Sequence, residues 1–189
     1  VLHELGKITD EELDLFREID SPLQGHPDKL RLPLMDATTG SLGQGLSIAI
    51  GHSYGKNLSD DCGTVFCVLG DGELQEGQVW EALMHYPMSG LSNLVCIIDW
   101  NKAQNDGYSD EFSIMYDNLK ERIKNTRLVN GHDMDLIRST LTLKEYGKPL
   151  CIILDTVKGK GVSFMEDPAW HCKVPTEEEY EIAMKELGV

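Results

Sequence analysis

The sequence lacks the features that would place it in a membrane or in a disulfide scaffold. No apolar run approaches the roughly 18 residues of a membrane span, and we find no internal repeat, low-complexity segment or linker. The five cysteines include no CxxC pair, and three of them fall inside apolar runs. Such scattered thiols predict a reducing compartment, and we therefore expect a cytoplasmic location.

Basic residues are scarce, since 17 Lys and Arg stand against 32 Asp and Glu, which gives a net charge of -15. This charge repels phosphate backbones and anionic lipid, so we expect neither nucleic acid nor a membrane surface as a partner. An anionic ligand would need local devices, such as backbone N–H groups, histidines or a divalent cation. A length of 189 residues with 41% apolar residues predicts one globular domain over residues 1–189.

Three short apolar runs predict strands of a parallel sheet. They span residues 64–70, 93–99 and 149–156, and they are continuous instead of alternating, as expected for strands buried on both faces. A glycine-rich turn leads into a helix within 38–55, and segments of helical period cover 74–86 and 134–147, where Gly147 would end the second helix. A capping box of Thr176 and Glu179 predicts a C-terminal helix. This alternation predicts an α/β fold, a mostly parallel sheet flanked by helices.

Acidic and amide side chains follow two of the predicted strands. The first strand ends in Gly70-Asp71-Gly72 and the second in Asp99-Trp100-Asn101, with one helix between them. Because ligands bind beyond the carboxyl ends of parallel strands, we expect Asp71 and Asn101 to lie side by side. A carboxylate, an amide oxygen and a backbone carbonyl are hard ligands for Mg²⁺ or Ca²⁺, and phosphate oxygens and water would complete the shell. The alternative interpretation is a pair of ordinary turn residues.

The wider sequence resembles transketolase, in particular the N-terminal half-subunit of split transketolases. A single GDG motif is weak, but GDG with a following Asn is that family's thiamine diphosphate fingerprint, and eight blocks match in family order. They are LQGHPD (23–28), TTGSLGQGLSIAIG (38–51), GDGELQEGQVWEA (70–82), NDGYSDE (105–111), NGHD (130–133), TVKGKGVSFMED (156–167), WHCK (170–173) and the terminal EEEYEIAMKELG. The resemblance implies the thiamine diphosphate-binding fold, in its diphosphate-binding domain, with thiamine diphosphate and Mg²⁺ (or Ca²⁺) as cofactors.

The resemblance also implies which residues hold the cofactor. Asp71, Asn101 and the backbone carbonyl of Ala103 would ligate the metal. The glycines Gly70 and Gly72 would let the backbone close on the diphosphate, with the Gly72 N–H donating to it. The segment that would line the aminopyrimidine consists of Ser41, Leu42 and Gly43.

Two histidines and one glutamate match family residues at the reaction centre. His26 would contact hydroxyl groups of the donor sugar, and His171 would lie near the diphosphate and the reacting carbons. Glu76 would join a carboxylate network at the dimer interface; its alternative is a solvated carboxylate at a helix start. The other histidines lack matching motifs and are interpreted as structural or surface residues: His3, His52, His85 and His132.

The implied activity is transfer of a two-carbon ketol unit from a ketose phosphate to an aldose phosphate, in pentose phosphate metabolism. The residues that activate the cofactor and grip the sugar phosphate belong, in the family, to a C-terminal pyrimidine-binding subunit. We therefore expect that partner, a dimer of two-chain units, and exposed apolar surface on the isolated chain. Because the chain begins at Val1 without the family's upstream histidine segment, we also expect a truncated N-terminus.

Two alternatives remain open at the level of the sequence. The first is a degenerate, non-catalytic assembly subunit or fragment of the same fold. The second is a subunit of another thiamine diphosphate enzyme, such as a 2-oxo acid dehydrogenase or a deoxyxylulose phosphate synthase. The blocks EGQVWEA and TVKGKGVSFMED argue against the second alternative.

Overall fold

The computed structural model describes residues 1–105, 107–108, 112–143 and 148–188, with the side chains of 112–114 left aside. The chain divides into two compact units, Val1–Gln44 and Gly45–Val189, and each is described by itself. The single domain predicted over residues 1–189 therefore stays a prediction. None of the helices in the described ranges is both long enough and apolar enough to cross a membrane.

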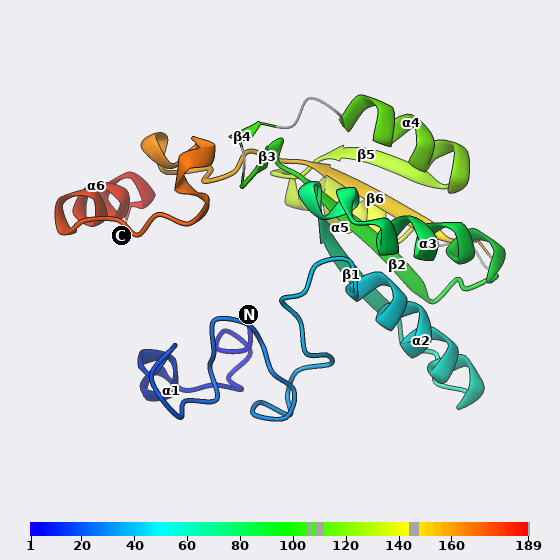
Figure 1. Ribbon diagram of the computed structural model, residues 1–189, viewed down its shortest axis with the longest axis horizontal. Coiled ribbons are helices and arrows are strands. Elements are labelled where there is room, and N and C mark those ends of the chain that lie inside the picture. Colours follow the sequence, from blue (N-terminus) through cyan, green and yellow to red (C-terminus); the bar gives the residue numbers. More distant parts are fainter. Residues whose placement is uncertain (106, 109–111, 144–147, 189) are drawn as a thin grey trace. The chain divides into compact units, whose positions relative to one another are not determined.

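The larger unit is built on a four-stranded parallel sheet (Figure 1). Its strands are β1 (Val65–Gly70), β2 (Leu94–Trp100), β6 (Leu150–Asp155) and β5 (Thr126–Asn130), in the spatial order β1-β2-β6-β5. The three strands predicted from apolar runs are confirmed to within one residue at each end. The predicted class, α/β with a parallel sheet flanked by helices, is confirmed.

Three helices cover one face of this sheet: α2 (Gly45–Leu58), α3 (Gly77–His85) and α4 (Phe112–Arg122). Their buried apolar side chains pack with those of alternate strand residues in one continuous core. A smaller cluster lies on the opposite face, where Leu141 of α5 (Met134–Leu141) packs against residues of β2, β5 and β6.

The edge strand β1 is buried on one face only. Its residues Cys67 and Leu69 lie in the main core, whereas Phe66 is 54% exposed and Val68 is 65% exposed. The register places these two exposed side chains beside Val95 and Ile97, on the face where α5 covers the other end of the sheet. The prediction that all three strands are buried on both faces is therefore wrong for β1.

The helix predicted over 74–86 has an interruption at its start. Gly72–Gln75 forms a 3₁₀ turn (η1), Glu76 is extended with φ -73° and ψ 127°, and α3 begins only at Gly77. The helix predicted over 134–147 ends at Leu141, and its predicted stop at Gly147 lies outside the described residues. The predicted capping box is confirmed, since Thr176 and Glu179 exchange both hydrogen bonds at the start of the last helix, α6 (Glu177–Leu187).

Short elements follow several of the strands and helices. A two-residue hairpin comes directly after Asn101, and three 3₁₀ turns punctuate the chain. The hairpin consists of β3 (Ala103–Gln104) and β4 (Gly107–Tyr108), and the turns are η2 (Tyr86–Met88), η3 (Ser163–Met165) and η4 (Pro168–His171).

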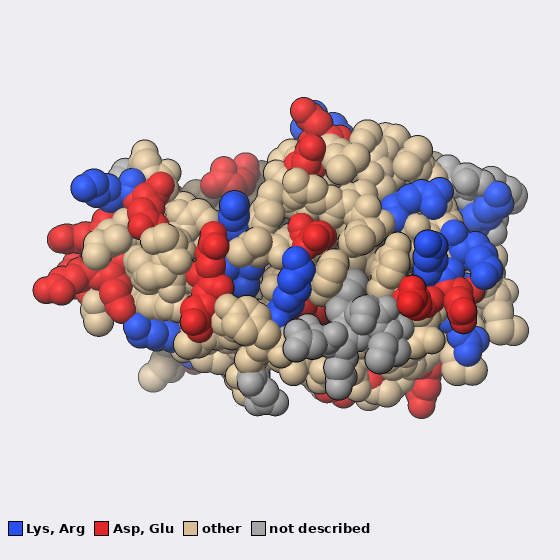
Figure 2. All heavy atoms as spheres, turned by 90° about the horizontal axis from the view of Figure 1, so that it is seen from above, with Lys and Arg blue, Asp and Glu red and all other residues tan. Residues whose placement is uncertain are grey.

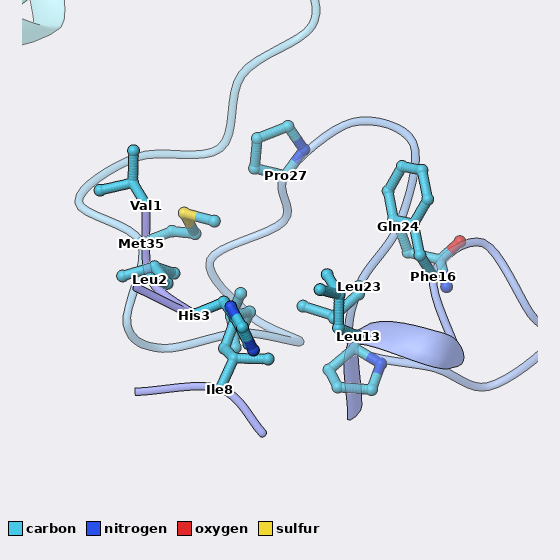
Figure 3. A pocket seen from close by; sticks show the side chains of 12 residues that line it. Val1, Leu2, His3, Ile8, Leu13, Phe16, Leu23, Gln24, Pro27 and Met35 are labelled. Carbon is cyan, nitrogen blue, oxygen red and sulfur yellow. The ribbon is translucent and has the colours of Figure 1, made fainter. Parts of the chain in front are cut away.

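The smaller unit, Val1–Gln44, contains one short helix and extended loops. Helix α1 (Asp10–Asp14) starts with its own capping box, in which Thr9 and Glu12 exchange hydrogen bonds. Figure 3 shows an apolar cavity of about 290 Å³ in this unit, lined by residues that include Leu13, Phe16 and Leu23.

Candidate thiamine diphosphate and metal site

The two strand ends that carry the predicted metal ligands lie side by side. The register of β1 and β2 pairs Gly70 with Asp99, so the residues that follow both strands reach the same edge of the sheet. The Asp71 N–H continues the ladder by donating to the Asp99 carbonyl at 3.1 Å. The crossover predicted from the sequence therefore brings these two ends together.

Asp71 is a buried carboxylate held by backbone donors. Its side chain is at the centre of the turn region and the residue is only 3% exposed. The Lys102 N–H donates to its Oδ2 at 2.6 Å, and the Gly72 N–H donates to its Oδ1 at 2.8 Å. Burial raises the pKa of Asp71 above its usual value, and the nearby Asp99 charge raises it further, while the backbone hydrogen bonds act in the opposite direction.

Asn101 has a defined side-chain orientation. Its Nδ2 donates to Asp99 Oδ2 at 3.1 Å, while its Oδ1 accepts the Ala103 N–H at 3.0 Å. The other oxygen of Asp99 accepts the hydroxyl of Thr156, which directly follows β6. An amide oxygen has two acceptor positions, so Asn101 Oδ1 retains capacity for a cation.

Lys102 adopts a backbone conformation that lysine rarely takes. Its φ is +64°, in the left-handed region, where a non-glycine residue costs about 1–2 kcal/mol. The Lys102 ammonium contacts Asp155 Oδ1 at 2.6 Å and lies 4.7 Å from the centre of the Trp100 ring. Both partners of this ion pair are 43% exposed, so the pair by itself contributes less than about 1 kcal/mol.

Gly72 is required by close packing and not by its backbone angle. A Cβ at this position would lie 3.2 Å from Gln104 Cβ, on the hairpin that follows Asn101. The Gly72 N–H, expected from the resemblance to face the diphosphate, donates here to Asp71. Its role as a diphosphate donor stays a prediction.

This set of groups fits a hard divalent cation. Within the ranges that the structure describes, no three or more His, Cys, Asp and Glu side chains gather to hold a metal. The available ligands are instead one carboxylate, one amide oxygen and the carbonyl of Ala103, which suit Mg²⁺ or Ca²⁺ when phosphate oxygens and water complete the shell. A cation here would also compensate the buried charge of Asp71.

The predicted aminopyrimidine segment and His26 lie in the smaller unit. Gly43 is buried with φ +85°, and Leu42 beside it is 56% exposed. His26 is exposed, and its ring lies so close to Gly40 that a Cβ there would be 2.8 Å from His26 Cγ. The position of these residues and of Ser41 relative to Asp71 stays a prediction.

His171 and Glu76 are both exposed. His171 ends the turn η4, which contacts β3 and β4 and therefore lies beside the hairpin that follows Asn101. Glu76 precedes α3 and makes no capping hydrogen bond with its side chain. Neither contact tests the role that the resemblance implies for these two residues.

Sequence reasoning did not identify Thr156 or Lys102 as parts of this edge. Thr156 directly follows β6, so applying the strand-end rule to the third apolar run would have found it. The left-handed conformation of Lys102 has no sequence signal, because glycine and asparagine are the residues that usually adopt it. His132, interpreted as structural, accepts the Val157 N–H at its Nε2 at 2.8 Å, consistent with that interpretation.

Known proteins match nearly the whole chain. The family model described as "Transketolase, thiamine diphosphate binding domain" matches residues 2–189. One of the two subunits of apulose-4-phosphate transketolase from Actinobacillus succinogenes is 36% identical over 192 residues, covering 98% of this chain and 69% of that protein. The 6-deoxy-6-sulfo-D-fructose transketolase subunit SqwG of a Clostridium species is 37% identical over 184 residues, covering 94% of this chain and 66% of that protein. The crystal structure of transketolase from Campylobacter jejuni matches with a TM-score of 0.82 at 30% identity, over 94% of this chain and 30% of that chain.

The sheet and the glycine-flanked aspartate at its carboxyl edge are those of a thiamine diphosphate-binding domain. More particularly, the chain belongs to the transketolase family of thiamine diphosphate-dependent transferases. It spans 69% and 66% of the two subunit relatives and 30% of the Campylobacter jejuni chain, so it corresponds to part of the whole enzyme.

Proposed function

We propose that this chain is the diphosphate- and metal-binding half of a transketolase that transfers a two-carbon ketol unit from a ketose phosphate to an aldose phosphate. The observation that carries the proposal is the buried Asp71 carboxylate beside Asn101 at the carboxyl edge of the sheet. A buried carboxylate with a raised pKa is costly unless a cation or another function retains it.

Asp71, Asn101 and the Ala103 carbonyl would hold Mg²⁺ (or Ca²⁺), and the cation would hold the diphosphate against the net charge of -15. Thiamine diphosphate, when bound, supplies the nucleophilic carbon and the electron sink for breaking a carbon–carbon bond. The exposed His26 and His171 would contact sugar hydroxyls and exchange protons with them near neutral pH. Ser41, Leu42 and Gly43 would line the cofactor ring.

The proposal includes a partner. The names of the Actinobacillus succinogenes and Clostridium relatives both describe one subunit of a larger enzyme, and we propose that this chain likewise works with a pyrimidine-binding subunit in a dimer of two-chain units. Glu76, exposed at the start of α3 with no capping bond, is available to a neighbouring subunit there. The named sugars of the two relatives differ, so the proposal covers sugar phosphates as a class.

Calorimetric titration of thiamine diphosphate with Mg²⁺, on this chain together with the pyrimidine-domain subunit, tests the proposal. The wild type should bind saturably and only with Mg²⁺. Asp71→Ala should weaken binding by at least about 100-fold, because losing even a residue outside a metal's ligand shell costs about 10–100-fold. The exposed Asp117→Ala on α4 is the matched control and should bind like the wild type. Absence of binding in a folded wild-type complex would leave a non-catalytic assembly subunit.

A further inference from the structure

We propose that Lys102 is a positioning residue whose ion pair with Asp155 holds the metal-binding turn Asn101–Ala103 in shape. The inference rests on the proposed function, because it concerns the same cofactor site. It adds a residue that none of the predicted roles includes.

The turn places Lys102 between two proposed ligands. Asn101 precedes it and Ala103 follows it, so a change in the backbone of Lys102 would move the ligands on both sides. In its left-handed conformation, with φ +64°, the Lys102 N–H donates to Asp71 Oδ2 at 2.6 Å. One unfavourable backbone angle therefore fixes the arrangement of three ligands, and something must hold that angle.

The side chain of Lys102 supplies this restraint. Its ammonium contacts Asp155 Oδ1 at 2.6 Å and lies 4.7 Å from the centre of the Trp100 ring. Trp100 and Asp155 are the last residues of β2 and β6 and are partners in the register of these strands. The lysine is thus anchored to the ends of two adjacent strands, while its backbone N–H reaches the residue after β1.

The sheet order argues against a direct contact between this ammonium and the diphosphate. Strand β2 lies between β1 and β6. Asp71 follows β1, whereas Asp155 ends β6, so the ammonium and the metal-binding carboxylate lie on opposite sides of the end of β2. This placement favours an indirect role, in which the lysine orders the ligands without contacting the cofactor.

The test measures Mg²⁺-dependent thiamine diphosphate affinity by calorimetry on the complex with the pyrimidine-domain subunit. The variants are Lys102→Met, Asp155→Asn, the double variant and Lys102→Arg, with the exposed Lys124→Met as the matched control. We expect Lys102→Met and Asp155→Asn each to weaken binding about tenfold, which corresponds to about 1.4 kcal/mol. The double variant should be no weaker than either single variant, because both remove the same ion pair. Lys102→Arg should restore most of the affinity.

The possible outcomes are distinct. An absence of wild-type binding overturns the proposed function itself. Wild-type binding that Lys102→Met leaves unchanged, or losses that multiply in the double variant, overturn the role of the ion pair. If Lys102→Met weakens binding while Asp155→Asn leaves it equal or tighter, the ammonium contacts the diphosphate directly and the positioning role is wrong. Thermal melting of each variant, followed by circular dichroism, separates these results from misfolding, and Lys102→Arg and Asp155→Asn keep the test available if Lys102→Met does not fold.

Discussion

Asp71 serves two opposing demands at the scale of a single residue. A metal ligand must be ionised, yet burial and the neighbouring Asp99 make ionisation of Asp71 less favourable in the folded chain than in the unfolded one. The backbone donors of Gly72 and Lys102 offset part of this penalty. The remaining penalty lowers stability in the absence of a cation, and cation binding would remove it.

The pH dependence of stability should reveal this penalty. A carboxyl whose pKa is raised in the folded state gives stability that is present below its unfolded pKa of about 4 and is lost as the pH rises through its folded pKa. Without divalent cations, the wild type should therefore lose stability relative to Asp71→Asn as the pH rises from about 4 to about 7. Urea denaturation at several pH values measures the difference, with the exposed Asp117→Asn as control. A difference that stays constant with pH would contradict the expectation.

At the scale of elements, the sequence predicts strands with continuous apolar runs best. β1, β2 and β6 were predictable because each is such a run. β5 was not, because Arg127 and Leu128 are exposed and only Thr126 and Val129 are buried, so the segment has little apolar signal. The helix period continues through Glu76 in sequence, which is why the interruption before α3 was missed.

The same limit applies to the site. Asp71 and Asn101 could be placed together because one βα crossover separates them, and strand ends of this kind meet at one edge. The contact of Thr156 with Asp99 joins residues 57 positions apart and depends on which strand lies beside β2. Strand order across the sheet is a tertiary property, so local spacing does not determine it.

Three cysteines form a row across the sheet. Cys67, Cys96 and Cys151 are register partners on β1, β2 and β6, and all three are buried. Burial raises the pKa of Cys67 to about 12. A hydrogen bond with Cys151, together with burial, raises the pKa of Cys96. These thiols are therefore protonated as well as covered near neutral pH.

A count of reactive thiols tests this row. Since the thiolate is the reactive form, only the exposed Cys62 and Cys172 should react with an aromatic disulfide reagent at a pH of about 8. All five thiols should react after unfolding in guanidinium. Cys62→Ser and Cys172→Ser should each remove one of the rapid reactions. Rapid reaction of a third thiol in the native protein would contradict the burial of the row.

At the scale of the whole molecule, negative charge is spread unevenly. Figure 2 shows carboxylates gathered over α6, whose first turn contains Glu177, Glu178 and Glu179. With a net charge of -15, the molecule attracts divalent cations and repels free diphosphate. Metal and diphosphate would therefore bind most favourably together, which is consistent with the Mg²⁺ requirement expected above.

The division into two units leads to a prediction about folding. Both apolar clusters of the sheet lie entirely within the larger unit, so the fragment Gly45–Val189 should fold without the first 44 residues. Circular dichroism should show a single cooperative thermal transition for this fragment, and its amide NMR spectrum should be well dispersed. The complete chain is the reference. A gradual, non-cooperative transition would show that the smaller unit is required for the core to form.

The position of Trp100 under the Lys102 ammonium has a practical consequence. The ammonium lies 4.7 Å from the centre of this ring, and the fluorescence of an indole changes when a nearby charge moves. Replacing Trp80 and Trp170 by phenylalanine would leave Trp100 as the single tryptophan of the chain. Emission from that variant would report rearrangement of the turn in real time, without any attached dye.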